Sequence, residues 1–329
     1  MRSRNVSIIF VVLAVVLVLN VILWNGKAEA QEKPYPSKPI TFIVTSAPGG
    51  PADVGTRIVL PELQKELGVA LNVEYKTGAG GMIGTSYVST AKPDGYTILS
   101  GMHGPFTTGP GMEKKPPYDP VRDFTPLGAY VLSPNVLAAC TPSVLTSFEA
   151  MVKISKEKPG VLNCATSGIG TSAHFTIELM KSRGVTLTQI PTKGAAPAIT
   201  ELLGKHVDLA LIMYQPLIPH IKSGEVKILI ATDRISQDPT IPTFMEKGFP
   251  EVAYLSGWQA FFGPRDLPKP VQERLTASIR KVVQTPSVVS ALEKAMFTVQ
   301  YWGPDELRNR ITEGYGTARK LFLLMQTEK

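Results

Sequence analysis

Cysteine, histidine and clustered charge are scarce in this sequence, and each scarcity excludes a class of protein. The 329 residues contain two cysteines and four histidines at scattered positions, without a spacing typical of a metal site. Lysine and arginine are spread along the chain and do not form the basic, aromatic-rich stripe of nucleic-acid binders. No low-complexity tract and no repeat of about 20 to 50 residues is present. We therefore expect no metal, no cofactor and no nucleic acid.

Motifs for catalysis are also missing. The sequence has no G-x-S-x-G elbow, no H-E-x-x-H pair and no G-x-x-x-x-G-K-[ST] loop, which are common signatures of hydrolases and nucleotide binders. Ser172 and His174 are a weak nucleophile and base pair, because residues two apart at a helix start point in different directions. We expect His174 to bond to backbone at a helix start. A secreted α/β hydrolase acting on a carboxylate-bearing substrate is kept as the alternative function.

A third class, the nucleotide-binding Rossmann proteins, ranks last. Neither of the glycine-rich turns described below contains the full G-x-G-x-x-G fingerprint.

The two cysteines allow two outcomes. Cys140 and Cys164 lie at or within expected strands, so they can pair in an oxidising compartment if those strands are neighbours, and are otherwise buried free thiols.

The N-terminus carries the signature of a secretory signal peptide. Arg2 and Arg4 precede a nearly uncharged run from Val6 to Trp24, and a small-residue cleavage pattern ends at Ala30. Cleavage near Ala30 removes three basic residues and one acidic residue, so the net charge falls from +7 to +5. The run approaches the length of a membrane span, so an uncleaved anchor is the competing interpretation.

The length and composition of the remainder predict two globular domains. A chain of 329 residues exceeds what one hydrophobic core usually supports. Hydrophobic residues make up 43% and charged residues 19% of the chain, values that exclude fibrous and disordered classes. We therefore expect a cleft between two domains of ordinary size.

The chain is organised around residues 40–67, which predict a buried strand, a glycine-rich turn and an amphipathic helix. Ile40–Val44 is apolar and β-branched, as in a strand covered on both faces. The turn Ala47–Pro51 follows, and Asp53 lies where a carboxylate suits a helix cap. Because the first amides of a helix lack internal partners, such a turn is a candidate anion site. The alternative is a plain connection without a ligand.

The same pattern recurs along the chain. A strand at 71–75 precedes the glycine-rich stretch 77–84 and a further helix, and a third strand spans 96–100. In the second half, a strand at 162–165 leads into the turn 166–172 and a helix from Ala173 to Lys181. Successive strand–helix units predict an α/β fold with parallel strands. The turn 166–172 is therefore a second candidate anion site.

An ordered set of motifs resembles the Bug family, the periplasmic substrate-binding proteins of tripartite tricarboxylate transporters. Each motif is weak alone, but together they follow the family's order over nearly all of the mature chain. They are Tyr35-Pro36-Ser37-Lys38-Pro39-Ile40, Pro48-Gly49-Gly50-Pro51-Ala52-Asp53, Gly78-Ala79-Gly80-Gly81-Met82-Ile83-Gly84, Pro93-Asp94-Gly95-Tyr96-Thr97, Ser167-Gly168-Ile169-Gly170-Thr171-Ser172-Ala173-His174, Lys193-Gly194-Ala195-Ala196-Pro197-Ala198 and Pro219-His220-Ile221-Lys222-Ser223-Gly224.

This resemblance implies a two-lobed α/β periplasmic binding protein of the type II-like fold, each lobe a mixed, mainly parallel sheet flanked by helices. We expect lobe 1 to comprise residues 31–131 and 258–329, and lobe 2 residues 132–257. It also implies a periplasmic, non-enzymatic receptor that closes on a small carboxylate and delivers it to integral membrane subunits of the transporter. We expect a monomer without a cofactor.

The resemblance places the ligand site at the two glycine-rich turns, with Gly78 and Gly80 shaping a wall. After the strand at 209–213 this chain has Met213 and Tyr214, where many relatives have small polar or acidic residues. An apolar, aromatic pocket would favour an aromatic or linear dicarboxylate over citrate or aspartate, with Trp258 flanking the spacer. The expected ligand-binding residues are Ser46, Gly49, Gly50, Asp53, Gly78, Met102, His103, Ser167, Gly170, Thr171, Ser172, Met213, Tyr214 and Trp258.

Overall fold

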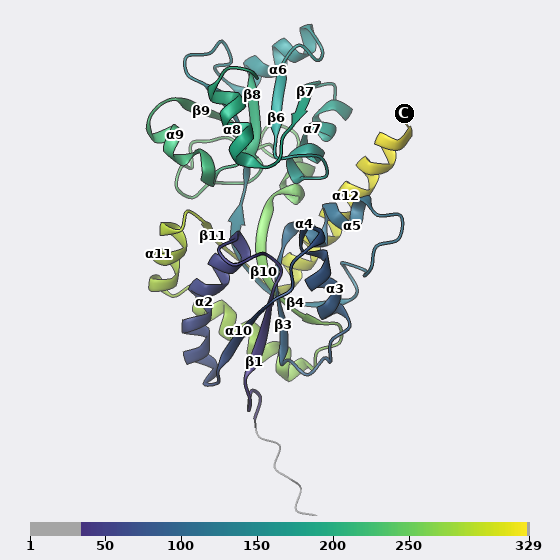
Figure 1. Cartoon of the computed structure of the whole chain (residues 1–329), viewed down its shortest axis with the longest axis vertical. Coiled ribbons are helices and arrows are strands. Elements are labelled where there is room, and N and C mark those ends of the chain that lie inside the picture. The colour runs from purple at the N-terminus through teal and green to yellow at the C-terminus, as the bar shows by residue number, and fades with distance from the viewer. Residues whose placement is uncertain (1–33, 328–329) are drawn as a thin grey trace, which may run out of the picture. The chain divides into compact units, whose positions relative to one another are not determined.

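The computed structural model describes residues 34–327, and residues 38–327 belong to one compact unit that contains two β-sheets (Figure 1). The expected signal peptide, residues 1–30, lies outside the described residues. Among the helices of the described part, none is both long and apolar enough to span a bilayer.

The first sheet has six strands in the order β2-β1-β3-β10-β4-β11. Strands β1, β2 and β3 pair in parallel, and β10 lies antiparallel between β3 and β4. β11 pairs antiparallel with β4, so four of the six strands run in one direction. The strands are β1 (Ile40–Val44), β2 (Leu71–Tyr75), β3 (Thr97–Met102), β4 (Phe124–Ser133), β10 (Gly257–Pro264) and β11 (Thr298–Trp302).

The second sheet repeats this arrangement with five strands in the order β7-β6-β8-β5-β9. β6 pairs in parallel with β7 and β8, while β5 lies antiparallel between β8 and β9. In both sheets the inserted antiparallel strand is the first one after the chain crosses from the other sheet. The strands are β5 (Asn135–Cys140), β6 (Asn163–Thr166), β7 (Thr188–Pro191), β8 (Leu209–Met213) and β9 (Val226–Ala231).

Helices connect the strands and flank the sheets (Figure 1). Those of the first sheet are α2 (Pro51–Leu67), α3 (Met82–Ser89), α4 (His103–Phe106), α5 (Thr108–Met112), α10 (Lys269–Val283), α11 (Pro286–Lys294) and α12 (Pro304–Thr327). Those of the second sheet are α6 (Phe148–Glu157), α7 (Ser172–Ser182), α8 (Ala195–Leu203) and α9 (Ile218–Lys222). The described residues also contain three short 3-10 helices: η1 (Ala79–Gly81), η2 (Gln215–Leu217) and η3 (Pro250–Leu255).

Local sequence explains where the main elements begin and end. Phe42 and Ile43 of β1 point to opposite faces of the sheet and are both buried, as the apolar run predicts for a strand covered on both faces. Helix α2 begins with Pro51, whose fixed φ suits a first helical position, and ends before Gly68, which adopts φ +73°. The Ser147 side chain caps α6 by accepting from the Ala150 amide at 3.2 Å.

Helix α12 links the two sheets, because it packs against elements of both. It contacts β4 and α5 beside the first sheet and η3 and α7 beside the second. Ala318 and Leu321 of this helix lie in the same buried cluster as Phe148 and Phe175 of the second lobe. Gly314 makes the close approach to η3 possible, since a Cβ there would lie 2.6 Å from the Tyr254 carbonyl oxygen.

The expected fold class is confirmed: the protein is a two-lobed α/β fold with two mixed sheets flanked by helices. Sequence reasoning missed β11 and the short helices α4 and α5. α5 has the sequence Thr-Gly-Pro-Gly-Met, in which glycine and proline suggest a loop. Cys140 and Cys164 are free thiols, because β8 lies between their strands β5 and β6.

Candidate functional site

A cavity of about 440 Å³ lies where the carboxyl ends of strands from both sheets meet. Ligands of open α/β sheets bind outside the carboxyl ends of the strands, at the point where strand order reverses. Both sheets have such a reversal, between β1 and β3 and between β6 and β8. The fold therefore places two reversal points on one cavity.

The first lobe contributes residues that follow β1, β2 and β3. Pro51 comes from the turn after β1, and Ala79, Gly80 and Met82 come from the turn after β2. Met102 ends β3 and is followed by His103, Gly104 and Pro105 of α4, with Thr108 and Gly109 from α5. Most of these groups are apolar side chains or backbone.

The second lobe contributes Gly170, Thr171 and Ser172 at the N-terminus of α7. The Thr171 hydroxyl caps the helix, accepting from the His174 amide at 3.4 Å and donating to the Gly168 carbonyl at 2.8 Å. Ser172 Oγ accepts from Asn135 Nδ2 at 2.7 Å, which leaves the Ser172 hydroxyl hydrogen available. The first amides of α7 carry partial positive charge, so this end of the helix suits an anion.

His174 holds the turn before α7 in place. The Gly170 amide donates to His174 Nδ1 at 3.0 Å, across a turn in which Gly170 adopts φ +79°. Burial lowers the pKa of His174, which keeps the ring neutral and Nδ1 able to accept. The expectation that His174 is a helix-start residue bonded to backbone is confirmed.

The crossings between the lobes form the floor of the cavity. Ser133 and Asn135 flank the first crossing, and Gly257, Trp258 and Gln259 lie on the returning strand β10. Trp258 is 2% exposed, and its ring packs edge-on against the His103 ring at a centroid distance of 5.9 Å. The indole is therefore part of the first lobe's core as well as of the cavity.

The cavity is electrically neutral. In the part of the chain that the structure describes, its lining contains no carboxylate, ammonium or guanidinium group. Burial lowers the pKa of His103 to about 4, although a hydrogen bond with the Tyr254 backbone acts in the opposite direction. Its Nε2 lies 2.8 Å from Thr107 Oγ1. His103 is thus neutral at pH 7, and the site offers dipoles and hydrogen-bond donors instead of charges.

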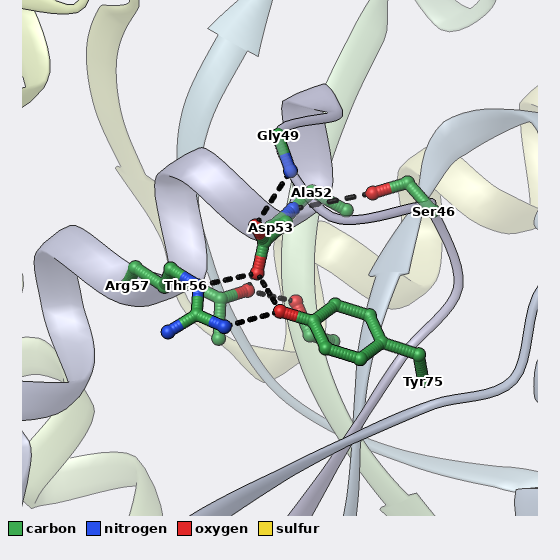
Figure 2. A network of polar contacts seen from close by, with 8 residues as sticks. Ser46, Gly49, Ala52, Asp53, Thr56, Arg57 and Tyr75 are labelled. Atoms are coloured by element: carbon green, nitrogen blue, oxygen red, sulfur yellow. Dashed lines mark hydrogen bonds and ion pairs between the residues drawn. The ribbon is translucent and has the colours of Figure 1, made fainter.

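The glycine turn after β1 is occupied by the protein's own carboxylate (Figure 2). The Gly49 amide donates to Asp53 Oδ2 at 2.8 Å, and the Gly50 amide donates to the Ala47 carbonyl at 2.9 Å. Ser46 Oγ accepts from the Asp53 amide at 3.2 Å. Both amides are therefore engaged within the protein, Gly49 by Asp53 and Gly50 by the Ala47 carbonyl, and a ligand role for this turn stays a prediction.

Asp53 is in turn fixed by two further residues (Figure 2). Tyr75 Oη donates to Asp53 Oδ1 at 2.7 Å, and Arg57 Nε bonds the same oxygen at 2.9 Å. Burial alone would raise the pKa of Asp53, but the bonds from Gly49 and Tyr75 and the Arg57 charge outweigh it and lower the pKa. The carboxylate is therefore charged, 3% exposed and fully engaged.

The structure brings half of the expected ligand-binding residues together around the cavity. Those lining it are Met102, His103, Gly170, Thr171, Ser172, Met213 and Trp258. Those outside its lining are Ser46, Gly49, Gly50, Asp53, Gly78, Ser167 and Tyr214. Tyr214 lies in the core of the second lobe, where it is 7% exposed. A ligand role for any of these residues stays a prediction.

Sequence reasoning missed Ser133, Asn135 and Gln259 on the floor. Ser133 and Asn135 flank Pro134 between two strands of different sheets, a position that a crossing between lobes would have indicated. Gln259 directly follows Trp258, but its partner Tyr130 is far away in the sequence. No local signal identifies such a residue.

A cavity with donors and apolar walls, but without a nucleophile–base pair, is suited to hold a solute. Ser172 and His174 do not bond to each other, since Ser172 Oγ accepts from Asn135 and His174 Nδ1 accepts from Gly170. The two sheets share the same reversal of strand order, and the ends of their strands meet at this cavity. The class defined by the fold and the site is a two-lobed solute-binding protein.

Comparison with known proteins identifies the family. Residues 56–320 match the tripartite tricarboxylate transporter family receptor, and the chain belongs to this family. BugT of Bordetella pertussis is 32% identical over 283 residues, which are 85% of this chain and 86% of BugT. The protein is thus a receptor of the Bug type, as the motifs indicated, and not an enzyme; this excludes the hydrolase alternative.

Solved structures agree with this assignment. A TctC solute-binding protein from Polaromonas has a TM-score of 0.79 at 25% identity, covering 87% of this chain and 98% of that one. MatC from Rhodopseudomonas palustris, solved with bound malate, has a TM-score of 0.65 at 26% identity, covering 88% and 100%. Receptors of this family are periplasmic, bind small carboxylates and work with the membrane components of their transporters.

Proposed function

We propose that this receptor captures a small dicarboxylate with an aromatic or linear spacer between its lobes and delivers it to the integral membrane subunits of its transporter. The observation that carries the proposal is the neutral cavity at the N-terminus of α7. A carboxylate there would accept hydrogen bonds from helix amides and from the Ser172 hydroxyl. MatC, which was solved with malate, supports a carboxylate of this size.

The lining disfavours amino acids. An ammonium group needs an acid or several acceptors, and none of the described residues around this cavity carries a carboxylate. A buried ammonium would therefore lose its water without a partner. Aspartate and glutamate should bind more weakly than the dicarboxylates of the same length that lack the amine.

The walls favour an apolar spacer between the two carboxylates. Met82, Met102 and Met213 lie around the cavity together with the Trp258 ring. Thioether side chains adapt to irregular shapes, and an indole adds a flat apolar surface. A volume of about 440 Å³ accommodates a ring or a short methylene chain.

Three further expectations belong to this proposal. The signal peptide is removed near Ala30, so the periplasmic protein starts at about residue 31. The lobes divide into residues 31–131 with 258–329 and residues 132–257, consistent with β4 ending at Ser133 and β10 beginning at Gly257. The receptor acts as a monomer.

A thermal-shift panel on the mature protein, residues 31–329, tests the proposal. A ligand that binds only the folded state raises the melting temperature by mass action. Malate, adipate and terephthalate should raise it at millimolar concentration, whereas aspartate, citrate and glucose should have smaller effects. Calorimetry should then give low-micromolar or tighter binding for the best dicarboxylate. Binding of neutral sugars without any carboxylate would refute it.

A further inference from the structure

Unpartnered hydrogen-bonding groups gather at the floor of the cavity. Seven described residues have a buried side-chain nitrogen or oxygen without a hydrogen-bond partner. Three of these seven, Ser133, Trp258 and Gln259, also line the cavity. Unpaired buried polar atoms are rare because burial removes their water, so a cluster of them calls for an explanation.

Strand pairing places the three residues beside one another. Ser133 ends β4 and lies opposite Gly257 of β10, and Trp258 and Gln259 are the next two residues of β10. Gln259 also lies opposite Met102 of β3, another cavity residue. Ser133 is 6% exposed and the other two are 2% exposed. Because side chains alternate along a strand, Ser133 and Gln259 lie on one face of the sheet and Trp258 on the other, so the three residues flank the cavity end of β10 from both faces. We call these three residues the crossing floor.

All three unpartnered atoms are donors. The Trp258 indole N–H can only donate, and the Ser133 hydroxyl can donate through rotation of its hydrogen. Gln259 Oε1 accepts from Tyr130 Oη at 2.9 Å, so the oxygen end of this amide is fixed. Nε2 is then the free end of the Gln259 side chain.

We propose that Ser133, Trp258 and Gln259 determine specificity by donating hydrogen bonds to a second carboxylate of the ligand. This inference rests on the proposed function, in which the first carboxylate lies at the N-terminus of α7. A monocarboxylate would leave the donors of the crossing floor unpaired, and a site built to bond a polar group strongly rejects an analogue that lacks it. The receptor therefore selects diacids over monoacids of the same shape.

Matched pairs of ligands test the proposal by calorimetry on the mature protein. The pairs are adipate with hexanoate, terephthalate with 4-methylbenzoate, and malate with 3-hydroxybutanoate. Each pair shares a carbon skeleton and differs by one carboxylate. The wild-type protein should prefer the diacid at least about tenfold in every pair that binds, which one well-placed hydrogen bond can supply.

Three variants assign the preference to the crossing floor. Trp258→Phe removes the indole N–H and keeps an aromatic ring, Ser133→Ala removes the hydroxyl, and Gln259→Glu keeps the acceptor for Tyr130 but replaces the donor with a negative oxygen. Each should lower diacid affinity at least about tenfold and change monoacid affinity less than about twofold. Met213→Leu on the apolar wall is the matched control and should shift both ligands of a pair alike.

The outcomes separate this proposal from the proposed function. Equal affinity for diacid and monoacid in the wild-type protein, or an unchanged preference in all three variants, overturns the crossing floor while carboxylate binding stands. Loss of all carboxylate binding in the wild-type protein overturns the proposed function itself. Circular dichroism of each variant shows whether it is folded, and one folded variant of the three suffices.

Discussion

At the scale of single residues, Asp53 is the residue whose role the structure changes most. The sequence suggests a ligand-binding or capping carboxylate, and the structure shows it satisfying the Gly49 amide, Tyr75 and Arg57. A carboxylate that already holds the glycine turn is a positioning group. Its negative charge would also repel a second anion near Gly49 and Gly50, and a ligand role for this turn stays a prediction.

Asp53→Asn should therefore destabilise the protein. The asparagine side chain has one oxygen, so it can accept from the Gly49 amide or from Tyr75 but not from both, and loss of a buried charged hydrogen bond costs about 1 to 3 kcal/mol. Urea denaturation of the mature protein measures the change in unfolding free energy. The matched control is Arg57→Gln, which should have a much smaller effect because the Arg57 side chain is 58% exposed. Equal stability of Asp53→Asn and wild type would contradict the positioning role.

His103 makes a second prediction at this scale, on pH. Its folded-state pKa of about 4 lies below the ordinary value of 6.5, so the unfolded chain binds more protons between these two pH values. Stability should consequently fall as pH drops from 6.5 towards 4, by roughly 3 kcal/mol from this group. The measurement is the unfolding free energy against pH for wild type and His103→Gln. A pH dependence that is the same in both proteins would exclude a buried neutral His103.

At the scale of elements, strands with a local sequence pattern were predicted, whereas elements that depend on long-range packing were missed. The strands at 40–44, 71–75 and 209–213 were predicted because apolar, β-branched runs with bounding turns are local signals. β11 and α5 were missed because they form through contacts with β4 and α12, which are distant in the sequence. The Cys140 and Cys164 pairing was also undecidable, since it depended on the placement of β8 between their strands.

The candidate site shows the same division. The turn before α7 was predicted because its Gly, Thr and Ser residues are adjacent in the sequence and cap a helix. Of the crossing floor only Trp258 was predicted, because Ser133 and Gln259 come together only through the pairing of β4 with β10. Sequence reasoning therefore found lining residues in four segments, at positions 102–103, 170–172, 213 and 258, and missed Ser133, Asn135 and Gln259.

Helix α12 allows a test of how the lobes are joined. Gly314 is buried, and a Cβ there would lie 2.6 Å from the Tyr254 carbonyl oxygen of η3. Gly314→Ala should separate α12 from η3 and lower the unfolding free energy by about 1 to 3 kcal/mol. Gly316→Ala, in the same helix, is the matched control: no atom lies within 4 Å of its Cβ position, and it should stabilise slightly. Thermal denaturation measures both, and a Gly314→Ala protein as stable as Gly316→Ala would refute the close contact.

At the scale of the whole molecule, the repeated strand order explains why one cavity has both a polar wall, at the N-terminus of α7, and an apolar wall. Each sheet directs its strand ends and the helices that follow them towards the same space. The second lobe provides the N-terminus of α7, the first lobe provides methionines and an indole, and the crossings provide the floor. A neutral site of this kind binds anions through dipoles and hydrogen bonds, so its affinity should depend only weakly on salt.

The central claim is that a carboxylate binds in the cavity between the lobes, and blocking that cavity tests it most directly. Gly104 lines the cavity, its φ lies outside the left-handed region, and no atom lies within 4 Å of its Cβ position. A larger side chain there would occupy ligand space without displacing protein atoms. Gly316→Leu, on the exposed face of α12 with equally open surroundings, is the control.

The measurement is calorimetric titration of wild type, Gly104→Leu and Gly316→Leu with the dicarboxylate that gives the largest thermal shift. Wild type and Gly316→Leu should bind with the same affinity, and Gly104→Leu should lose at least about a hundredfold, because its side chain takes the place of the ligand. Circular dichroism should show the same fold in all three. A folded Gly104→Leu protein that binds the dicarboxylate as tightly as wild type would contradict the claim.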